Sequence, residues 1–377
     1  MSNLSQFPLV QYLEEKARRR IPNVALAYLN CGTGDDRGVQ RNIDGLEKVN
    51  LTPRFMKGEI VPELRTMLFG REYAAPFGIA PIGLTGLMWP QAEIILAKTA
   101  KKFNIPFSLS TVATETPETI GHHVGKMGWF QLYPPRKKEL RDDILKRAKD
   151  NGFHTLLVTV DVPYPSRREN SVKAGLSMPP KITGKFIYEA LSHPAWTVAT
   201  LKRGLPKLRT MSKYVPSGDT GDIVKFVGEN LGFNLSWDYI KEVRDIWHGP
   251  MVLKGIVHPE DAEKTVAIGC DGVLISNHGA RQFNGGKAAI DSLKEIVPVI
   301  KGKTTILFDS GIRSGLDVLK AIAIGADFIL LGRSFLWGVA ALGSQGGDHV
   351  ATMIIDDIKN NMMQLGCTSL LEVRHVL

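Results

Sequence analysis

The sequence predicts an α/β protein of the TIM (β/α)8 barrel class, with an N-terminal extension and a long insertion after the fourth strand. Three observations support this class. Eight short apolar runs recur along the 377 residues, helical patterns lie between most of them, and each run ends in a polar or glycine-bearing loop. Buried apolar strands that alternate with helices indicate a parallel sheet, and eight such units indicate a closed barrel.

The expected strands are the apolar runs, taken in chain order. They are Pro76–Ala80, Pro106–Leu109, Trp129–Leu132, Thr155–Val160, Met251–Leu253, Gly272–Ile275, Thr305–Phe308 and Phe328–Leu331. Apolar residues at 3.6-residue spacing predict helices between them. These helices are Gln91–Phe103, Leu140–Lys149, Pro259–Ile268, Ile290–Val299 and Gly315–Ile324.

We expect one domain over residues 1–377, with the barrel at about residues 72–366. The residues before Pro76 form the extension. Val160 and Met251 are about 90 residues apart, which is far more than one crossover needs. Part of this gap, about residues 175–235, is therefore predicted to be an insertion on the active-site side or a lid.

The composition limits the class of protein. Hydrophobic residues make up 44% of the chain and charged residues 23%, which is a globular balance. The three cysteines are far apart and odd in number, so we expect no disulfide framework, no metal site and a reducing, cytoplasmic location. The N-terminal residues lack a cleavable signal pattern, and no stretch approaches the roughly 20 apolar residues of a membrane span. The net charge of +9 favours an anionic partner, but zinc-finger, RNP-type and basic heptad motifs are missing, so we expect no nucleic acid.

Polar or glycine residues follow all eight expected strands, at the end of the barrel where function resides in this fold. A barrel built for packing alone has no reason to carry them there. In strand order they are Ala80, Pro81, Ile82 and Gly83; Ser110 and Thr111; Gln131 and Tyr133; Thr159 and Asp161; Lys254; Ser276, His278 and Arg281; Asp309, Gly311 and Arg313; and Gly332 and Arg333.

The last two loops predict a phosphate site. A phosphate is often bound after strands seven and eight of such a barrel, where Gly311, Arg313, Gly332 and Arg333 stand. Glycines let backbone N–H groups approach an anion, and arginine grips phosphate with a planar fork. The alternative is a pair of turns with solvated arginines.

Several motifs together suggest a family. They are Ala80-Pro81-x-Gly83, Leu109-Ser110-Thr111, Phe130-Gln131-Leu132-Tyr133, Thr159-Val160-Asp161, Arg167-Arg168-Glu169, Lys254-Gly255, SNHGARQ at 276–282, Asp309-Ser310-Gly311-x-Arg313 and Leu331-Gly332-Arg333. In this order the chain resembles the FMN-dependent 2-hydroxy acid dehydrogenase and oxidase family, which includes glycolate oxidase and the flavin-type lactate and mandelate dehydrogenases. Gly83 and Asp309-Ser310-Gly311 resemble the lactate and mandelate dehydrogenase branch.

The resemblance implies FMN as the cofactor. Its phosphate would lie at Gly311, Arg313, Gly332 and Arg333, and Asp309 would bind the ribityl hydroxyls. Lys254 would lie beside the flavin N1–C2 carbonyl, where a fixed cation stabilises developing negative charge. The alternative for Lys254 is a buried lysine paired with a carboxylate. The isoalloxazine would be lined by Ala80, Pro81, Ile82, Ser110, Gln131, Thr159 and Ser276.

The substrate side follows from the chemistry of a 2-hydroxy acid. Its carboxylate calls for arginine, so Arg281 and Arg168 are the candidates, with the hydroxyl of Tyr28 as a third donor. Tyr133 would hydrogen-bond the substrate oxygen. The substrate must also lose a proton to a base, for which the candidate is His278.

An aspartate bonded to the His278 imidazole would favour its protonated form and fix its tautomer, and Asp161 is the matching acid. Two routes stay open: His278 takes the α-proton, or it takes the hydroxyl proton while hydride passes to the flavin.

The expected activity is oxidation of an L-2-hydroxy acid to a 2-oxo acid, with electrons passed to quinone or another carrier. The close alternative is an oxidase that reduces O2 to H2O2, and the rival from another class is a non-catalytic flavoprotein or an isomerase-type barrel. Val112 and Gly83 favour a substrate bulkier than glycolate, so lactate- and mandelate-like acids come first. Gly83 is expected to leave room at the flavin ring.

The insertion also suggests a partner. Between Lys181 and Lys213 basic residues alternate with Phe186, Ile187, Tyr188, Leu191, Trp196, Val198 and Leu201, and Glu189 is the single acid. This pattern favours peripheral contact with the anionic inner face of the cell membrane, as in the dehydrogenase branch. The alternative is a solvated lid with a small apolar underside. By the same resemblance we expect a homo-oligomer, a tetramer. The basic residues are Lys181, Lys185, Lys202, Arg203, Lys207, Arg209 and Lys213.

Overall fold

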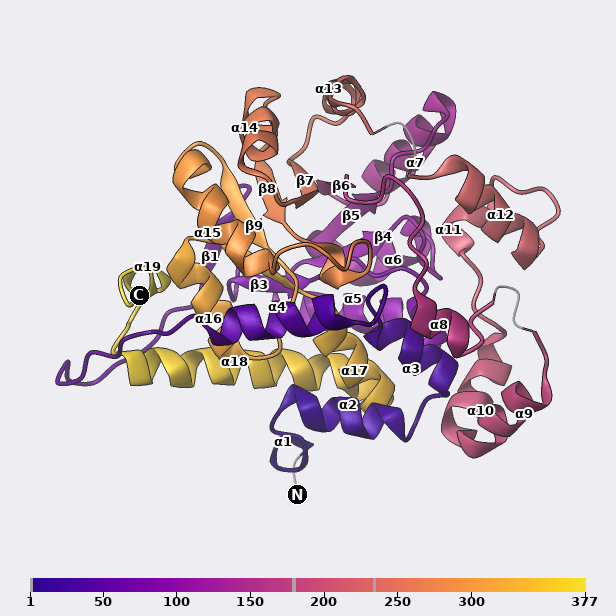
Figure 1. Cartoon of the computed structure of the whole chain (residues 1–377), viewed down its shortest axis with the longest axis horizontal. Helices are drawn as coiled ribbons and strands as arrows, with labels where there is room; N and C mark the ends of the chain where they lie inside the picture. The colour runs from indigo at the N-terminus through magenta and orange to yellow at the C-terminus, as the bar shows by residue number, and fades with distance from the viewer. Residues whose placement is uncertain (1–2, 178–180, 233–234) are drawn as a thin grey trace.

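A computed structural model describes residues 3–177, 181–232 and 235–377. Eight parallel strands form a closed barrel in the order β10-β3-β4-β5-β6-β7-β8-β9 (Figure 1). The predicted TIM barrel is therefore confirmed. The strands are β3 (Phe77–Ile79), β4 (Phe107–Ser110), β5 (Gly128–Leu132), β6 (Thr155–Thr159), β7 (Met251–Ile256), β8 (Gly272–Ile275), β9 (Thr305–Phe308) and β10 (Phe328–Leu331).

The strands form where the sequence is continuously apolar, because both faces of a parallel strand in a barrel are buried. All eight predicted strands are present, and β8, β9 and β10 have the predicted bounds. β7 runs three residues further than predicted, to Ile256, and its register with β8 shifts between Lys254 and Ile256. The residue in this irregularity is Gly255, whose φ is +103°.

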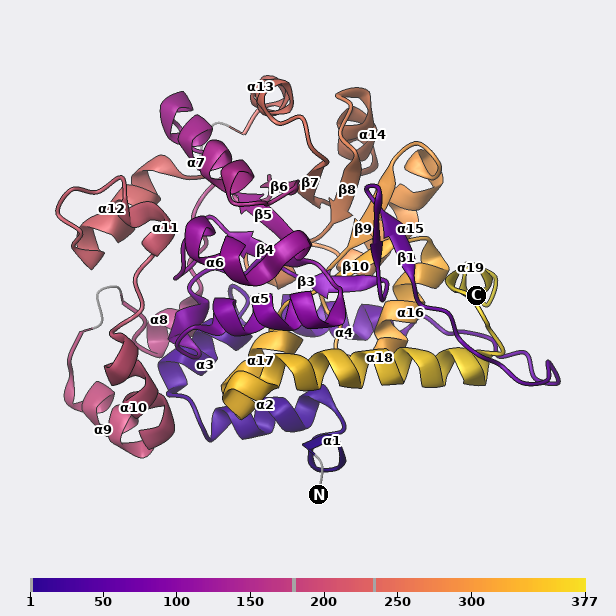
Figure 2. The same cartoon turned by 180° about the vertical axis from the view of Figure 1, so that it is seen from behind.

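Helices surround the barrel, and the five that the sequence predicted are all present within two residues of their expected ends (Figures 1 and 2). Ser314 starts α16 with a capping box that includes Asp317. The helices around the strands are α5 (Ala92–Phe103), α6 (Pro117–Val124), α7 (Lys138–Asp150), α13 (Trp237–Ile246), α14 (Pro259–Ala267), α15 (Ala289–Ile300), α16 (Gly315–Ile324) and α17 (Arg333–Leu342). The long α18 (Gly346–Leu365) and the short α19 (Leu370–Val373) complete the C-terminal part.

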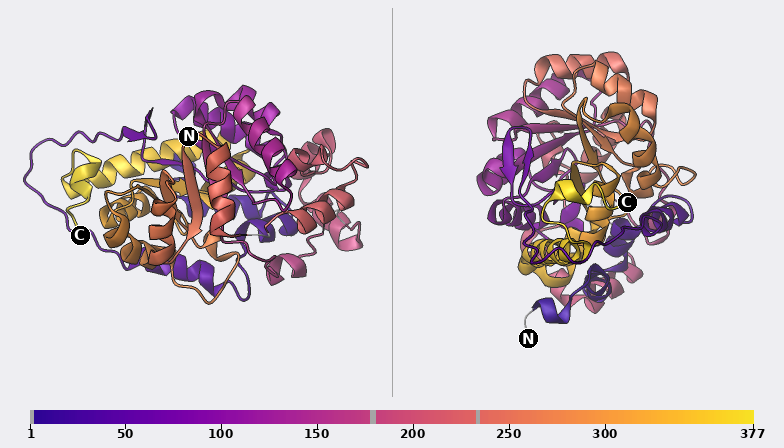
Figure 3. Two further views of the ribbon diagram at one scale, coloured as in Figure 1. Left: turned by 90° about the horizontal axis from the view of Figure 1, so that it is seen from above. Right: turned by 90° about the vertical axis from the view of Figure 1, so that its left-hand side faces the viewer.

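The N-terminal extension closes one end of the barrel and reaches the other. A hairpin of β1 (Thr66–Leu68) and β2 (Arg71–Tyr73) covers the beginnings of the barrel strands, where Phe69 and Tyr73 lie 5.9 and 6.2 Å from the Trp129 ring. Before the hairpin come α1 (Asn3–Gln6), α2 (Val10–Arg18), α3 (Asn23–Asn30) and α4 (Arg37–Glu47). The segment between α4 and β1 projects past the C-terminal end of α18 (Figures 1 and 3).

The predicted insertion between β6 and α13 consists of short helices, and residues 178–180 and 233–234 within it lie outside the described residues. Pro194 begins α10, so the chain turns there. In Figure 1 α9 and α10 lie together at the periphery, whereas α11 and α12 lie beside α7. The helices are α8 (Glu169–Lys173), α9 (Gly184–Ser192), α10 (Pro194–Arg203), α11 (Arg209–Ser212) and α12 (Thr220–Asn230).

Not every residue of the insertion that was expected at the membrane faces outward. Trp196 is buried, and its indole N–H donates to the Leu87 carbonyl at 2.9 Å. Arg203 pairs with the buried Glu115, and Lys213 pairs with Asp143. Trp196 was therefore wrongly grouped with the membrane-facing residues, because it is buried where the insertion meets the barrel. The side chains of Arg203 and Lys213 remain 34% and 55% exposed although they form these ion pairs. None of the helices in the described part of the chain has the length and apolarity that a membrane crossing needs.

Candidate active site

A cavity of about 480 Å³ opens at the carboxyl ends of the barrel strands. Of the thirteen residues expected to bind FMN, nine line it, and so do the four expected to bind substrate. Asp161, Ser110, Gln131, Thr159 and Ser276 lie behind or beside this lining. The lining residues among the predicted ones are Tyr28, Ala80, Pro81, Ile82, Tyr133, Arg168, Lys254, His278, Arg281, Asp309, Gly311, Arg313, Gly332 and Arg333.

A chain of hydrogen bonds crosses the strand ends on one side of the barrel. Ser110 Oγ donates to Gln131 Oε1 at 2.9 Å, and Gln131 Nε2 donates to Thr159 Oγ1 at 2.8 Å. The three residues belong to the neighbouring strands β4, β5 and β6, and all three are buried. Their position and polarity suit the edge of a planar heterocycle that carries carbonyl and ring-nitrogen groups.

A second polar group continues around the barrel on the next strands, since Lys254 of β7 is the register partner of Thr159 of β6. The ammonium of Lys254 pairs with the carboxylate of Asp309 and donates to Ser276 Oγ at 2.9 Å. The alternative for Lys254, pairing with a carboxylate, is thus observed as well, and its partner is another of the residues predicted to bind FMN. Ser276 Oγ also accepts from the backbone N–H of His278 at 3.0 Å. The lysine site and the histidine loop are therefore joined through one hydroxyl.

His278 lies between an acid and a phenol. Its Nδ1 lies 2.9 Å from Asp161 Oδ1, and its Nε2 lies 3.3 Å from the Tyr133 hydroxyl. Since the carboxylate holds the proton on Nδ1, Nε2 is the nitrogen left to accept one. Burial raises the pKa of Tyr133 above its usual value, so this phenol stays protonated and can donate.

The backbone at His278 and at Gly255 has conformations that position the His278–Asp161 pair. His278 has a φ of +58°, an uncommon value for a residue with a side chain, at a turn capped by Asn277. A Cβ on Gly255 would lie 2.5 Å from both Cβ and Cγ of Asp161, so only glycine fits beneath this carboxylate. Asp161 Oδ2 is buried and has no hydrogen-bond partner among the described residues. The Asp161 carboxylate thus packs closely against Gly255 on one side and is hydrogen-bonded to the His278 imidazole on the other.

Four arginines line the cavity, and the pKa of three of them, Arg281, Arg313 and Arg333, is lowered. Burial lowers the pKa of Arg313 to about 10, and burial together with the nearby Arg313 and Arg281 lowers that of Arg333 well below its usual value. Within the described residues, no carboxylate forms an ion pair with any of these guanidinium groups. Partly buried cations without a counter-ion are costly, so the site fits a bound anion such as the FMN phosphate.

The N-terminal extension completes this region with backbone carbonyls, whereas the sequence predicted only the Tyr28 hydroxyl from it. Arg281 Nη1 donates to the carbonyls of Tyr28 and Cys31 at 2.7 and 3.1 Å, and Arg333 donates to those of Leu29 and Cys31 at 3.0 and 3.1 Å. These carbonyls lie at the C-terminal end of α3, which is the negative end of a helix. The end of α3 therefore orients two of the cavity's arginines.

Tyr28 and Arg168 reach the cavity from outside the barrel strands. The Tyr28 hydroxyl donates to the Gly83 carbonyl at 3.1 Å, and the Arg281 guanidinium lies 4.8 Å from the Tyr28 ring. Arg168 precedes α8 with a φ of +44°, and its Nε donates to Ser166 Oγ at 3.1 Å. Arg168 and Arg281 thus line one cavity from two different loops, and their role in binding a carboxylate stays a prediction.

The expectation that Gly83 leaves room at the flavin ring stays a prediction, and the structure shows a second reason for glycine at this position. A Cβ on Gly83 would lie 2.5 Å from Cγ2 of Val112, so this valine already occupies the space. The two residues come from loops after different strands, and their contact depends on how those strands pair. The sequence named both residues but could not show that one fills the space beside the other.

Further lining residues come from the insertion. Val224, Val227, Gly228 and Leu231 belong to α12 or follow it, and Val162 and Pro165 come from the loop after β6. The sequence carried one signal for α12, since Val224, Val227 and Leu231 have the spacing of one helical face. It did not show that this face turns toward the cavity.

Comparisons with known proteins agree with this geometry. The sequence model of a family described as "FMN-dependent dehydrogenase" matches residues 17–377. An L-lactate dehydrogenase of Allorhizobium ampelinum is 37% identical over 361 residues, which cover 95% of each chain. One of Ectopseudomonas mendocina is 36% identical over 360 residues, which cover 95% of this chain and 94% of the other.

Two solved structures are also similar. A crystal structure of the "monotopic membrane protein (S)-mandelate dehydrogenase" is 30% identical, with a TM-score of 0.93 over 97% of each chain. A mandelate oxidase is 29% identical, with a TM-score of 0.83 over 98% of this chain and 97% of the other.

Proposed function

Because the chain belongs to the FMN-dependent dehydrogenase family and is an FMN-dependent 2-hydroxy acid oxidoreductase, we propose that it oxidises an L-2-hydroxy acid, lactate- or mandelate-like, to the 2-oxo acid. The observation that carries this proposal is the position of His278 between Asp161 and Tyr133 in a cavity rich in arginine. A flavoprotein without catalysis has no need of this group, and against an isomerase-type barrel stands the match to the dehydrogenase family.

The chain's own residues do the following work. Arg281 and Arg168 bind the substrate carboxylate, with the Tyr28 hydroxyl as a further donor. The Tyr133 hydroxyl donates to the substrate's oxygen. His278 accepts the proton that the substrate must lose, from the α-carbon or from the hydroxyl, and Asp161 stabilises the imidazolium that results.

The residues that would hold FMN are those that the family pattern names. Arg313, Arg333, Gly311 and Gly332 would bind its phosphate, and Asp309 would bind the ribityl hydroxyls. Lys254 would stabilise negative charge on the ring. The ring would lie against Ala80, Pro81, Ile82, Ser110, Gln131, Thr159 and Ser276. When bound, FMN takes up the two electrons that the substrate loses.

For the electron acceptor we propose quinone or another carrier, and an oxidase that reduces O2 to H2O2 is the alternative. Both chemistries occur among the similar proteins, since one solved structure is a dehydrogenase and another is an oxidase. H2O2 yield in air, compared with the rate on a soluble quinone analogue, separates the two.

The insertion supports a proposal about location, namely peripheral attachment to the inner face of the cell membrane. No residue of α9 is buried, and Tyr188 and Leu191 are 70% and 76% exposed. The single acid Glu189 points inward, where it accepts from the Asn23 backbone N–H at 2.9 Å. The outer face of α9 therefore combines apolar side chains with Lys185.

A homotetramer is proposed as well, and light scattering of the purified protein tests it.

The direct test of the function is anaerobic reduction of the bound flavin, followed by its absorbance. We expect bleaching by L-lactate, L-mandelate or L-2-hydroxyoctanoate, and a slower reaction with glycolate. A yellow protein that none of these acids bleaches would remove the proposal.

A further inference from the structure

The cavity has a charged part and an apolar part. Its charged groups are those that face the substrate carboxylate and the FMN phosphate. One part of the remaining wall is apolar, and it includes Val112, Val162, Pro165, Val224, Val227 and Leu231. A substrate whose carboxylate is held by Arg168 and Arg281 can place an apolar side chain against this second part.

The C-terminal end of α12 is held directly beside the catalytic group. The backbone N–H of Gly232 donates to the Pro134 carbonyl at 3.0 Å, and that of Arg136 donates to the Asn230 carbonyl at 2.8 Å. Pro134 follows Tyr133 in the chain. A Cβ on Gly232 would also lie 3.0 Å from the Val162 carbonyl, one residue after Asp161. This end of α12 is therefore fixed against the two loops that carry Tyr133 and Asp161.

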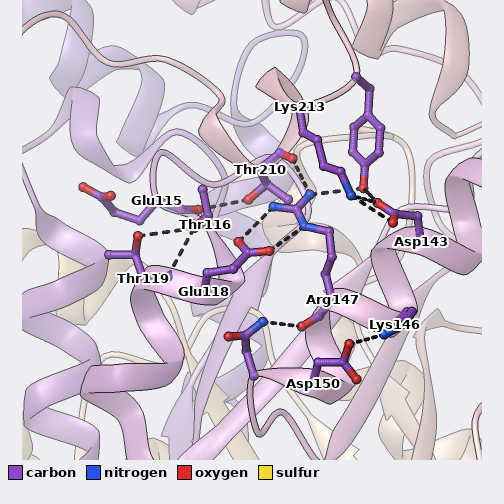
Figure 4. Close-up of polar contacts among 12 residues, drawn as sticks. Glu115, Thr116, Glu118, Thr119, Asp143, Lys146, Arg147, Asp150, Thr210 and Lys213 are labelled. Atoms are coloured by element: carbon purple, nitrogen blue, oxygen red, sulfur yellow. Dashed lines mark hydrogen bonds and ion pairs between the residues drawn. The ribbon is translucent and has the colours of Figure 1, made fainter.

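The other side of α12 is held by a polar network centred on Arg147 of α7. Figure 4 shows Arg147 between Glu118 and Thr210, with Lys213 and Asp143 beside it. Its guanidinium donates twice to Glu118, at 2.7 and 3.0 Å, and once to the Thr210 carbonyl at 2.9 Å.

The same guanidinium connects this network to α12. It donates to the Tyr214 hydroxyl at 3.1 Å, and the Tyr214 ring stacks on Phe226 of α12 with their centroids 6.5 Å apart. The Tyr214 hydroxyl in turn donates to Asp143 at 2.6 Å. Contacts thus run without a break from the barrel helix α7 to α12, so α12 is a fixed wall of the cavity.

Gly228 is a gap in this wall. It lies between Val227 and Leu231 on the cavity side and is solvent-exposed. An added Cβ would meet no atom within 4 Å, and the residue has no positive φ. Neither the backbone nor a neighbouring side chain therefore requires glycine here, in contrast to Gly83, Gly232 and Gly255, where an added Cβ would meet neighbours.

We propose that Gly228 is a specificity-determining residue: the notch it leaves in α12 receives the substrate's side chain, so the enzyme prefers 2-hydroxy acids whose apolar side chain is larger than methyl. This inference rests on the proposed function and narrows its substrate class.

The test is the series Gly228→Ala, Gly228→Leu and Gly228→Phe, with kcat/KM measured for L-lactate, L-2-hydroxyoctanoate and L-mandelate. The larger replacements fill the notch. We expect kcat/KM for the two larger acids to fall by roughly tenfold or more in the Leu and Phe variants, and that for lactate to change by less than about threefold. FMN content and the melting temperature report whether each variant is folded.

Gly184 provides the matched control. It also has open space around its Cβ position and no positive φ, but it begins α9 and does not line the cavity. Gly184→Leu should leave all three values unchanged.

A loss shared equally by lactate and the larger acids, or no loss for any of them, in folded Gly228 variants would overturn the inference while the proposed function stands. If no acid reduces the flavin of the unsubstituted enzyme, the proposed function itself fails and the inference fails with it.

Discussion

The imidazole of His278 hydrogen-bonds Asp161, with 2.9 Å between Nδ1 and Oδ1. This contact orients the ring so that Nε2 lies on the side of Tyr133. His278→Gln keeps a polar side chain but removes the base. We expect it to lower the rate of flavin reduction by about 10²-fold to 10⁴-fold while FMN stays bound. Stopped-flow absorbance measures the rate. The control is His248→Gln at an exposed histidine, which should react at the normal rate. Normal reduction by the His278 variant would rule out its role as base.

Gly255 positions Asp161, so a side chain at this position should act on the base indirectly. Gly255→Ala places a Cβ 2.5 Å from Cβ and Cγ of Asp161 and must displace the carboxylate. We expect flavin reduction to slow by roughly tenfold or more, with a changed pH profile and FMN retained. In an Asp161→Gly background the same substitution should cause little further loss, because the residue it displaces is gone.

The control for Gly255 is Gly269→Ala. Gly269 has a φ of +81°, so alanine there is strained in the same way, but nothing lies within 4 Å of the added Cβ. If both substitutions changed the pH profile equally, the slower flavin reduction would be due to backbone strain and not to displacement of Asp161.

The arginines of the cavity should control FMN affinity. Arg333→Ala and Arg313→Ala each remove a partly buried cation that fits the phosphate, and a charge-assisted hydrogen bond of this kind contributes about 1.5–3 kcal/mol. We therefore expect FMN to bind the apoprotein roughly tenfold to a hundredfold more weakly, as measured by fluorescence titration. Arg65→Ala, at an arginine whose side chain is 63% exposed, should bind FMN normally. Unchanged affinity in both cavity variants would place the phosphate elsewhere.

Much of the fold follows from the sequence, because a buried parallel strand is continuously apolar and can be recognised without its partners. The positions of His278 and Lys254 were predictable for a related reason, since the carboxyl ends of all barrel strands converge. Their pairing with Asp161 and Asp309 joins residues that are 117 and 55 positions apart in the chain. Only the family pattern could suggest such contacts.

The parts that the sequence did not predict all depend on elements outside the barrel strands. The carbonyls at the end of α3 receive Arg281 because the whole extension folds across the barrel mouth. Trp196 looked like a membrane-facing aromatic, yet its indole N–H needs an acceptor and finds one at Leu87. Local periodicity carries no information about either contact, because both depend on how distant segments dock.

The Arg147–Glu118 pair should make stability depend on pH in the acid range. Hydrogen bonds from Arg147 lower the pKa of Glu118 to about 2 from 4.5. Since the folded-state pKa is the lower one, the stabilisation is fully present above about pH 4.5 and is lost as the pH falls toward 2. The Glu118 side chain is 45% exposed, so we expect the contribution to be only about 1 kcal/mol.

Urea unfolding at pH 6.5 and pH 3.5 measures this effect. Glu118→Gln should be less stable than the unsubstituted protein at the higher pH, and the difference should shrink at the lower pH. Glu59→Gln, at an exposed carboxylate in the segment before the hairpin, should show no such difference at either pH. A gap between the Glu118 variant and the parent that stays constant with pH would contradict the assignment.

Membrane attachment should depend on the apolar outer faces of α9 and α10. Leu191 and Leu201 are 76% and 77% exposed, one on each helix. A leucine that leaves water contributes up to about 1.5–3 kcal/mol, so the double substitution Leu191→Ser with Leu201→Ser should weaken binding to vesicles by tenfold or more, with flavin reduction in solution unaffected. Cosedimentation with vesicles of phosphatidylglycerol and phosphatidylcholine measures the binding.

The matched control is Leu371→Ser, at a leucine that is 68% exposed on α19, away from the insertion. The basic residues of the insertion add an electrostatic part, so raising the salt concentration should weaken binding further. Two results would show that this face does not contact the membrane. One is an equal loss of vesicle binding in the double variant and the control, and the other is an unsubstituted protein that stays in the supernatant.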